Sequence, residues 1–108
     1  MKFELYKSKN GEFYFRLKAK NGQNILGSEG YKTKSSAENG IASVQKNSQD
    51  ENRFEVKQAK NEKWHFNLKS TNGQVIGSSQ MYASKSGMTN GIESVMKNAP
   101  GASIDDQT

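Results

Sequence analysis

The chain contains an internal duplication that covers most of its length. When it is aligned with itself at a shift of 51 residues, residues 3–48 match residues 54–99 without a gap, and 22 of those 46 positions are identical. Two such copies form similar units, which bury their apolar surfaces most effectively by packing together. We therefore expect a single domain over residues 1–108, made of repeat one (1–50) and repeat two (51–108).

Each repeat opens with a pattern that is typical of β-strands. Apolar and polar residues alternate over residues 3–7 (FELYK) and 13–18 (FYFRLK), and again over residues 54–58 (FEVKQ) and 64–69 (WHFNLK). Alternation with a period of two indicates strands with one buried face. A third strand through Ile25, and its counterpart in repeat two, would complete an antiparallel meander in each unit.

The turns between these strands are also encoded. Asn10-Gly11 and Asn21-Gly22 accept positive φ, and they predict two-residue hairpin turns. Asn72-Gly73 repeats the second of these turns, whereas Asn61-Glu62 replaces the first.

Each repeat ends with a helical pattern. The helices are predicted to begin at Ser35 and Ser86, and a capping box from Ser35 to Glu38 supports the first. Gly40 and Gly91 lie at the edge of the apolar helix face, although a glycine inside a helix costs about 1 kcal/mol relative to alanine. We interpret them as sites where the helix approaches the sheet closely, the alternative being inheritance from the duplication without a packing role. The predicted core between sheet and helices is Phe3, Phe15, Leu17, Ile41, Val44, Phe54, Trp64, Phe66, Leu68, Ile92 and Val95.

Composition narrows the classes of function. Only 31% of residues are apolar, there is no cysteine, and His65 is the only histidine. We expect no metal site, no cofactor and no catalytic residue, because no nucleophile and base can be paired and the carboxylates are scattered. A charged, strand-like start and the absence of a long apolar stretch predict a cytoplasmic protein without membrane attachment.

The motifs together resemble a known family. FELYK, FYFRLK, NGQ, SEGY and SSAENGIASVQKN, echoed by FEVKQ, WHFNLK, NGQ and SGMTNGIESVMKNAPGASIDD, are similar to the YegP-like proteins, small bacterial proteins of unknown function. The resemblance spans essentially the whole chain, and NGI-x-SV-x-KN is its most specific motif. It brings no accepted activity, substrate or cofactor.

This resemblance implies an α+β fold. Two tandem β-β-β-α-β units would share one antiparallel sheet, with two helices on one face and exchanged closing strands. Arg53–Gln58 would both close repeat one and open repeat two, and Ala102–Asp105 would close repeat two. Since each repeat supplies the other's partner, we expect a monomer with internal pseudo-two-fold symmetry.

The first functional hypothesis is a non-catalytic interaction module that binds a protein partner. The outer side of each predicted helix carries four polar residues that are identical between the repeats, whereas other positions outside the core have changed. A structural role is the alternative, with the serines capping and the asparagines bonding to a neighbouring loop or strand. These residues, the helix stripe, are Ser35, Asn39, Ser43, Lys46, Ser86, Asn90, Ser94 and Lys97.

The second hypothesis is weak binding of single-stranded nucleic acid. The net charge is +5, and the sheet face opposite the helices would interleave cations with flat rings, which suits stacked bases and phosphates. Glu4 and Glu55 lie on the same face and weaken this reading. The candidate residues are Tyr6, Tyr14, Arg16, Lys18, Lys57, His65, Asn67 and Lys69.

Overall fold

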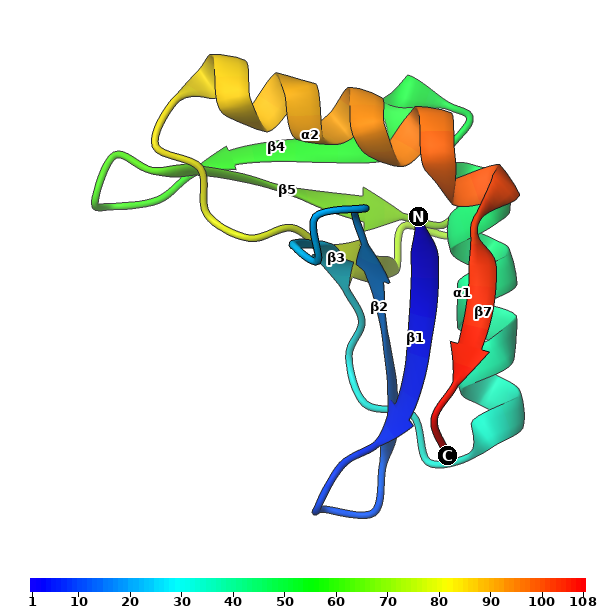
Figure 1. Cartoon of the computed structure of the whole chain (residues 1–108). Coiled ribbons are helices and arrows are strands. Elements are labelled where there is room, and N and C mark those ends of the chain that lie inside the picture. The colour runs from blue at the N-terminus through cyan, green and yellow to red at the C-terminus, as the bar shows by residue number, and fades with distance from the viewer.

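The computed structural model describes all residues from 1 to 108 as one seven-stranded sheet with two helices packed against it, an α+β fold (Figure 1). The strand order is β4-β5-β6-β3-β2-β1-β7. Repeat one contains β1 (Lys2–Lys7), β2 (Phe13–Lys18), β3 (Asn24–Gly27) and α1 (Lys34–Asn47). Repeat two contains the short 3-10 helix η1 (Glu51–Arg53), β4 (Phe54–Gln58), β5 (Trp64–Lys69), β6 (Val75–Ser78), α2 (Lys85–Asn98), the 3-10 helix η2 (Ala99–Gly101) and β7 (Ser103–Asp106).

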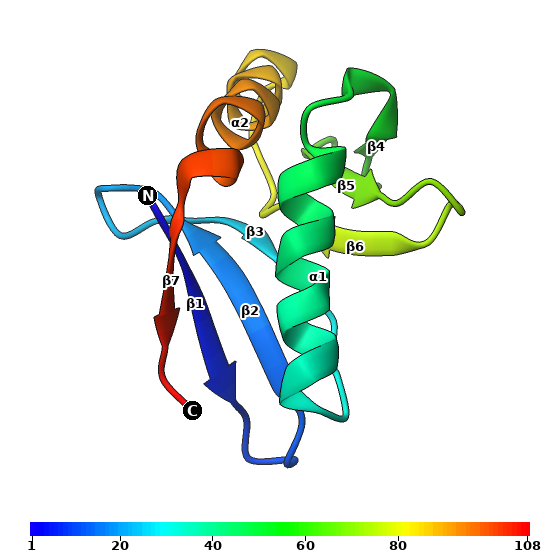
Figure 2. The same ribbon diagram turned by 90° about the vertical axis from the view of Figure 1, so that its right-hand side faces the viewer.

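The two repeats meet at the centre of the sheet. Each forms an antiparallel meander, and the meanders join where β3 and β6 pair at Gly27 and Ser78. The strands of repeat one cross those of repeat two at a steep angle, and α1 stands beside both halves (Figures 1 and 2). Helix α1 contacts β1 and β2 of its own repeat together with β5 and β6 of the other, so the repeats share one core.

The hairpin turns differ from the prediction of two-residue loops. Gly11 and Gly22 have φ of 82° and 84°, but the asparagines before them do not have positive φ. Each glycine N–H instead bonds to the carbonyl three residues back, at 3.0 and 2.9 Å. The side-chain oxygen of Asn10 accepts from the N–H of Glu12 at 2.9 Å, so asparagine is used here for its side-chain hydrogen bond.

The helices begin one residue before the predicted starts. Thr33 and Ser84 are the N-caps, and their hydroxyls accept from the N–H of Ser36 at 3.1 Å and of Gly87 at 3.0 Å. The predicted capping box from Ser35 is therefore wrong, because a hydroxyl two residues earlier already caps the first turn.

The helix glycines have a packing role in both repeats. A Cβ on Gly40 would lie 2.6 Å from the Tyr31 hydroxyl oxygen and 2.8 Å from the Phe15 ring. Gly91 faces Tyr82 and Phe66 in the same way, with the Tyr82 Cζ at 2.8 Å. The close approach is therefore between the helix backbone and a stacked pair of rings that stands on the sheet.

The strand after each helix lies in the sheet of the other repeat, but only one outer edge is covered. After α2, β7 crosses to repeat one and pairs with β1 in parallel, Phe3 opposite Ile104 and Leu5 opposite Asp106, so the sheet is mixed. β4 opens repeat two, but it pairs only with β5 and forms an edge of the sheet. The expectation for Arg53–Gln58 is confirmed, because this segment follows α1 through η1 as the closing strand of repeat one and, as β4, pairs with β5 to open repeat two.

The open edge of β4 explains two of the three errors in the predicted core. Eight of its eleven members are buried, but Phe54, Trp64 and Ile92 are only partly buried. Phe54 and Ile92 lie beside the uncovered edge of β4, whereas Phe3 and Ile41 in repeat one are buried. Trp64 begins its strand next to a hairpin turn, as the partly buried Phe13 does in repeat one.

Candidate functional site

A groove runs between the outer edge of β4 and helix α2, and it has a volume of about 330 Å³. We call it the β4 groove. One end is bounded by η1, and the walls are formed by Phe54, Val56, Thr89, Ile92, Glu93 and Met96. Val56 is 43% exposed, one of three large apolar side chains with high exposure in the whole chain. The groove thus combines an apolar lining with a strand edge that has no neighbour.

The same place in repeat one is filled. Phe3 and Leu5 correspond to Phe54 and Val56, and both are 0% exposed beneath β7 and α1. The Leu5 carbonyl accepts a hydrogen bond from the N–H of Gln107 at 2.8 Å. There β7 lies along the outer side of β1, and Ala99 and Ala102, just before β7, are buried in the core.

The backbone of β4 is oriented to receive a strand in the same way. Val56 lies opposite Phe66, whose N–H bonds away from β4 to the Ser79 hydroxyl at 2.9 Å. In an antiparallel pair, two directly opposite residues either bond to each other or both point their N–H and C=O groups away from the partner strand. Since Phe66 points its N–H away from β4, the N–H and C=O of Val56 point to the outer side of β4. An exposed edge of this kind is a template for pairing with another chain.

Charges differ between the two ends of the β4 groove. Glu51 and Glu93 lie at or near the end where β4 begins. Lys85 lies near the other end, with its amino group 5.7 Å from the ring centroid of Trp64, the residue paired with Gln58 of β4. Lys85 forms no salt bridge, whereas its repeat-one counterpart Lys34 pairs with Asp106 of β7 at 2.5 Å.

That ion pair shifts the titration of both partners. The hydrogen bond from Lys34 lowers the pKa of Asp106 from 3.8 to about 2, with further hydrogen bonds from Thr108. The same contact raises the pKa of Lys34. Both shifts favour the charged pair that fastens the end of β7 to the start of α1.

The helix stripe is exposed or partly exposed in both repeats. Asn39, Asn90, Lys46 and Lys97 are exposed, and none of their side chains has a hydrogen-bond or salt-bridge partner within the chain. Ser43 instead accepts a hydrogen bond from Asn47 at 3.1 Å, and Ser35 and Ser86 do not cap the helices. Ser94 is partly buried and receives a bond from Asn98 at its carbonyl.

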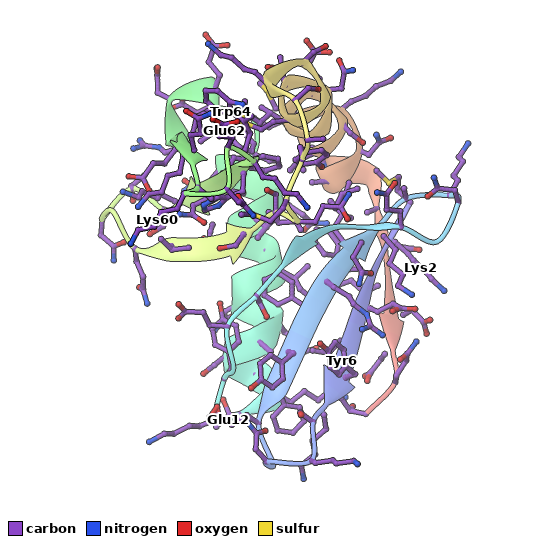
Figure 3. The ribbon with its side chains drawn as sticks, turned by 90° about the vertical axis from the view of Figure 1, so that its left-hand side faces the viewer. Lys2, Tyr6, Glu12, Lys60, Glu62 and Trp64 are labelled. Atoms are coloured by element: carbon purple, nitrogen blue, oxygen red, sulfur yellow. The ribbon has the colours of Figure 1, made fainter.

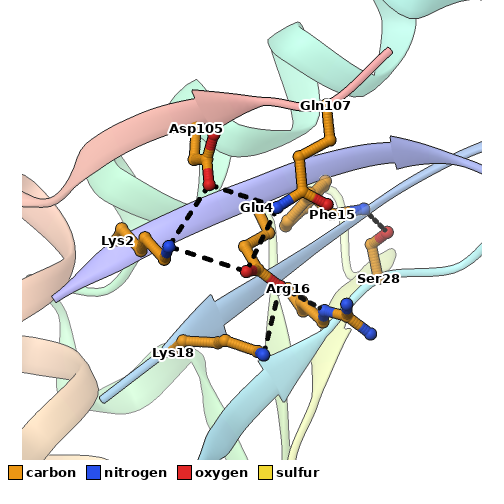
Figure 4. A network of polar contacts seen from close by, with 8 residues as sticks. All are labelled: Lys2, Glu4, Phe15, Arg16, Lys18, Ser28, Asp105 and Gln107. Atoms are coloured by element: carbon orange, nitrogen blue, oxygen red, sulfur yellow. Dashed lines mark hydrogen bonds and ion pairs between the residues drawn. The ribbon is translucent and has the colours of Figure 1, made fainter. Parts of the chain in front are cut away.

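The open sheet face of repeat one is organised around a buried carboxylate. Glu4 is 6% exposed and receives Arg16 at 2.7 Å, Lys18 at 3.3 Å, Lys2 at 3.7 Å and Gln107 at 3.3 Å (Figure 4). The hydrogen bond from Arg16 is the main reason that the pKa of Glu4 is lowered, and burial opposes it. This network ties the tail after β7 to β1 and β2.

The sequence-predicted nucleic-acid residues are divided between β1 and β2 in repeat one and β4 and β5 in repeat two, at opposite ends of the sheet. Tyr6 and Tyr14 stack on each other with centroids 5.8 Å apart, and Arg16 lies 4.5 Å from the Tyr6 ring. In Figure 3, Tyr6 lies with the strands of repeat one in the lower half of the molecule, and Trp64 of repeat two lies in the upper half. The repeat-one candidates are therefore already engaged with one another and with Glu4.

Their counterparts in repeat two surround Glu55. Lys69 pairs with it at 2.8 Å and Lys57 at 3.5 Å, and Asn67 bonds it at 3.4 Å. These contacts, led by the one from Lys69, lower the pKa of Glu55. His65 lies on β5 opposite Lys57 and is partly buried. Nucleic-acid binding stays a prediction, and the lysine and arginine side chains proposed for it already pair with Glu4 or Glu55 within the chain.

No three side chains among the histidine, aspartate and glutamate residues gather in a geometry that could hold a metal ion. Neither helix has the length and apolar character needed to cross a membrane.

The sequence interpretation missed the β4 groove. Its signals were present, since Leu5 is replaced by the shorter Val56 and Gln45 by the apolar Met96. The clearest signal was topological: only a short connection lies between α1 and β4, too short to supply a closing strand for repeat two. The structure defines a class of protein in which two β-β-β-α units are fused. A strand covers the outer edge of β1 in the first unit, and no strand covers the equivalent edge of β4 in the second.

Comparisons with known proteins assign this class to a family. A family model described as a domain of unknown function (DUF1508) matches residues 8–55 and again residues 59–106. The UPF0339 protein PA0329 of Pseudomonas aeruginosa is 53% identical over 107 residues, covering 99% of this chain and 97% of that protein. The UPF0339 protein YegP of Escherichia coli (strain K12) is 53% identical over 106 residues, covering 98% and 96%.

Two solution NMR structures show the same fold. The UPF0339 protein SO3888 from Shewanella oneidensis gives a TM-score of 0.92 at 53% identity, covering 97% of this chain and 89% of that one. The structure of YegP from Escherichia coli, a protein of unknown function, gives 0.94 at 52% identity, covering 99% and 92%. The chain belongs to the UPF0339 family of YegP-like proteins, with two DUF1508 repeats, as its sequence motifs indicated.

Proposed function

We propose that this protein is a non-catalytic binding module that takes up a strand from a protein partner in the β4 groove. One observation carries the proposal: the edge of β1 is covered by β7, while the equivalent edge of β4 is open beside a partly exposed apolar lining. Addition of a strand to a free sheet edge is a common mode of peptide recognition, with backbone bonds giving affinity and side-chain pockets giving selectivity.

The helix stripe offers a second surface for the same function. Asn39 and Asn90 are exposed and have no partner within the chain, so their retention in both repeats is not explained by a hydrogen bond inside the fold. Two equivalent stripes would suit a partner that contacts both helices. The β4 groove takes precedence because it adds apolar area and backbone groups, which are stronger determinants of binding than exposed polar side chains.

Affinity capture with matched variants tests the proposal. Val56→Lys places a charge in the β4 groove, and Ile104→Lys makes the same change at an exposed edge position of β7, where Ile104 is 50% exposed. From a nuclease-treated bacterial lysate, we expect the wild type and Ile104→Lys to retain the same specific protein and Val56→Lys to lose it.

The nuclease treatment separates this function from nucleic-acid binding. Retention of the same proteins by Val56→Lys would contradict groove binding, and loss on a joint Lys46→Glu and Lys97→Glu change would instead assign the partner to the helix stripe. Capture that disappears with nuclease would favour the nucleic-acid alternative.

A further inference from the structure

We infer that the occupant of the β4 groove is an extended segment of a partner protein that runs parallel to β4 and carries an aliphatic residue two positions before an acidic one. This inference rests on the proposed function and specifies its ligand. The chain itself provides the template, because β7 occupies the equivalent place in repeat one.

The template defines the spacing. In β7, Ile104 lies opposite Phe3 and Asp106 lies opposite Leu5, so both side chains share the helix-facing side of the sheet. In repeat two, the corresponding positions are opposite Phe54 and Val56. Ile104 in β7 is itself 50% exposed, but in repeat two an aliphatic residue at this position would lie beside the partly buried Phe54 and Ile92 and would add apolar burial that the groove now lacks.

The template also defines the acidic residue. Asp106 of β7 pairs with Lys34 at the start of α1, and Lys85 holds the same place at the start of α2. Lys85 is exposed and makes no salt bridge, in contrast to Arg53, which pairs with Asp50 at 3.6 Å. An acid at the second position of the occupant would therefore meet an available cation.

The charges of the groove determine the direction of the occupant. A parallel strand places its acidic end near Lys85 and its amino-terminal part near Glu51 and Glu93. An antiparallel strand would bring the acid to these two glutamates, where like charges repel. A basic residue before the aliphatic position would strengthen the parallel arrangement further.

A peptide titration of the full-length chain tests this inference. The probe is the octapeptide Gly-Ala-Ser-Ile-Asp-Asp-Gln-Thr, which reproduces residues 101–108 and so contains the inferred spacing. By backbone amide NMR, we expect it to shift Val56 and Gln58, and the peptide of reversed sequence to shift them much less. The intramolecular β7 has a large effective concentration, so it should keep the edge of β1 filled.

Two matched charge reversals sharpen the test. We expect Lys85→Glu to weaken binding of the peptide by about fivefold, because the change removes one exposed ion pair and places a like charge in its place. Lys9→Glu makes the same change in the exposed turn between β1 and β2 of repeat one and should leave affinity unchanged. A paramagnetic label at the amino terminus of the peptide should broaden Glu51 and Met96 if the strand is parallel.

Several outcomes would overturn the inference. The first is broadening of the Gln58 and Lys85 signals by the label, and the second is an equal effect of the two lysine variants on peptide affinity. The others are absence of amide shifts in β4 at millimolar peptide, shifts confined to β1, and a dimer of the chain that protects the β4 amides. If the peptide does not bind but Val56→Lys loses the captured partner, the proposed binding function stands and only the parallel, acidic strand is excluded as the occupant. Retention of capture in Val56→Lys would remove the groove function itself.

Discussion

Repeat one and repeat two have nearly the same elements, yet their outer edges are in different states. The edge of β1 lies under β7, and Leu5 is fully buried, whereas the edge of β4 is free and Val56 is 43% exposed. The difference arises from connectivity, because a linear chain of two repeats has only one strand after its last helix. Duplication therefore copied the edge but supplied a cover for only one of the two copies.

The largest expected effect concerns the dependence of one repeat on the other. Residues 1–50 expressed alone should show no cooperative thermal transition by circular dichroism, because they lack β7 and the β5 and β6 surfaces that α1 contacts. A half-domain of this size also buries too little surface to be stable alone. A folded, monomeric fragment would show instead that the shared sheet is not required.

Equivalent truncations at the two edges should differ strongly. Leu5→Ala should lower the free energy of unfolding by about 2–5 kcal/mol, as for other fully buried leucines. Val56→Ala should cost less than ~1 kcal/mol, because its side chain is already half in solvent. Urea unfolding of both variants measures the comparison, and similar costs would mean that β4 is covered in solution.

The helix glycines test a feature that the two repeats share, the close packing of the helix backbone against two aromatic rings. Gly40→Ala and Gly91→Ala should each lower stability by a net ~1–2 kcal/mol, because overpacking against the rings outweighs the gain in helix propensity. The tyrosine contact is similar at both sites, with Cζ 2.9 Å from the Cβ at Gly40 and 2.8 Å at Gly91. The second ring is closer at Gly40, where Phe15 lies at 2.8 Å compared with 3.3 Å for Phe66 at Gly91, so Gly40→Ala should cost more. A stabilised alanine variant would support the alternative that the glycines were simply inherited.

The smallest expected effect on stability is that of acid. We expect low pH to loosen β7 from the edge of β1 before it loosens the rest of the sheet. The pKa of Asp106 in the folded chain, about 2, lies below its ordinary 3.8, so the stabilisation is present above pH 3.8 and is lost as the pH falls toward 2. Amide exchange should then speed up in β7 before it does in β5. Lys34→Met should reduce this pH dependence, while Lys85→Met serves as the control in repeat two.

Much of the architecture could be predicted from local patterns. Alternation located the strands of each meander, the helix pattern located α1 and α2, and the duplication predicted a common sheet. The errors at the helix starts and turns were local in origin: a hydroxyl just before each helix competes with Ser35 and Ser86 for the N-cap, and an asparagine in a turn can act through its side chain.

The sequence by itself determined the elements, the two-unit composition and the family, because these depend on periodicity and on residues repeated along the chain. Only the tertiary structure decided which edge is covered. Phe3 and Phe54 are identical residues in equivalent patterns, and no local rule separates them. Their burial differs because strand pairing is a long-range choice: β7 can occupy a single edge, and once it lies on β1, the apolar residues beside β4 remain in contact with solvent.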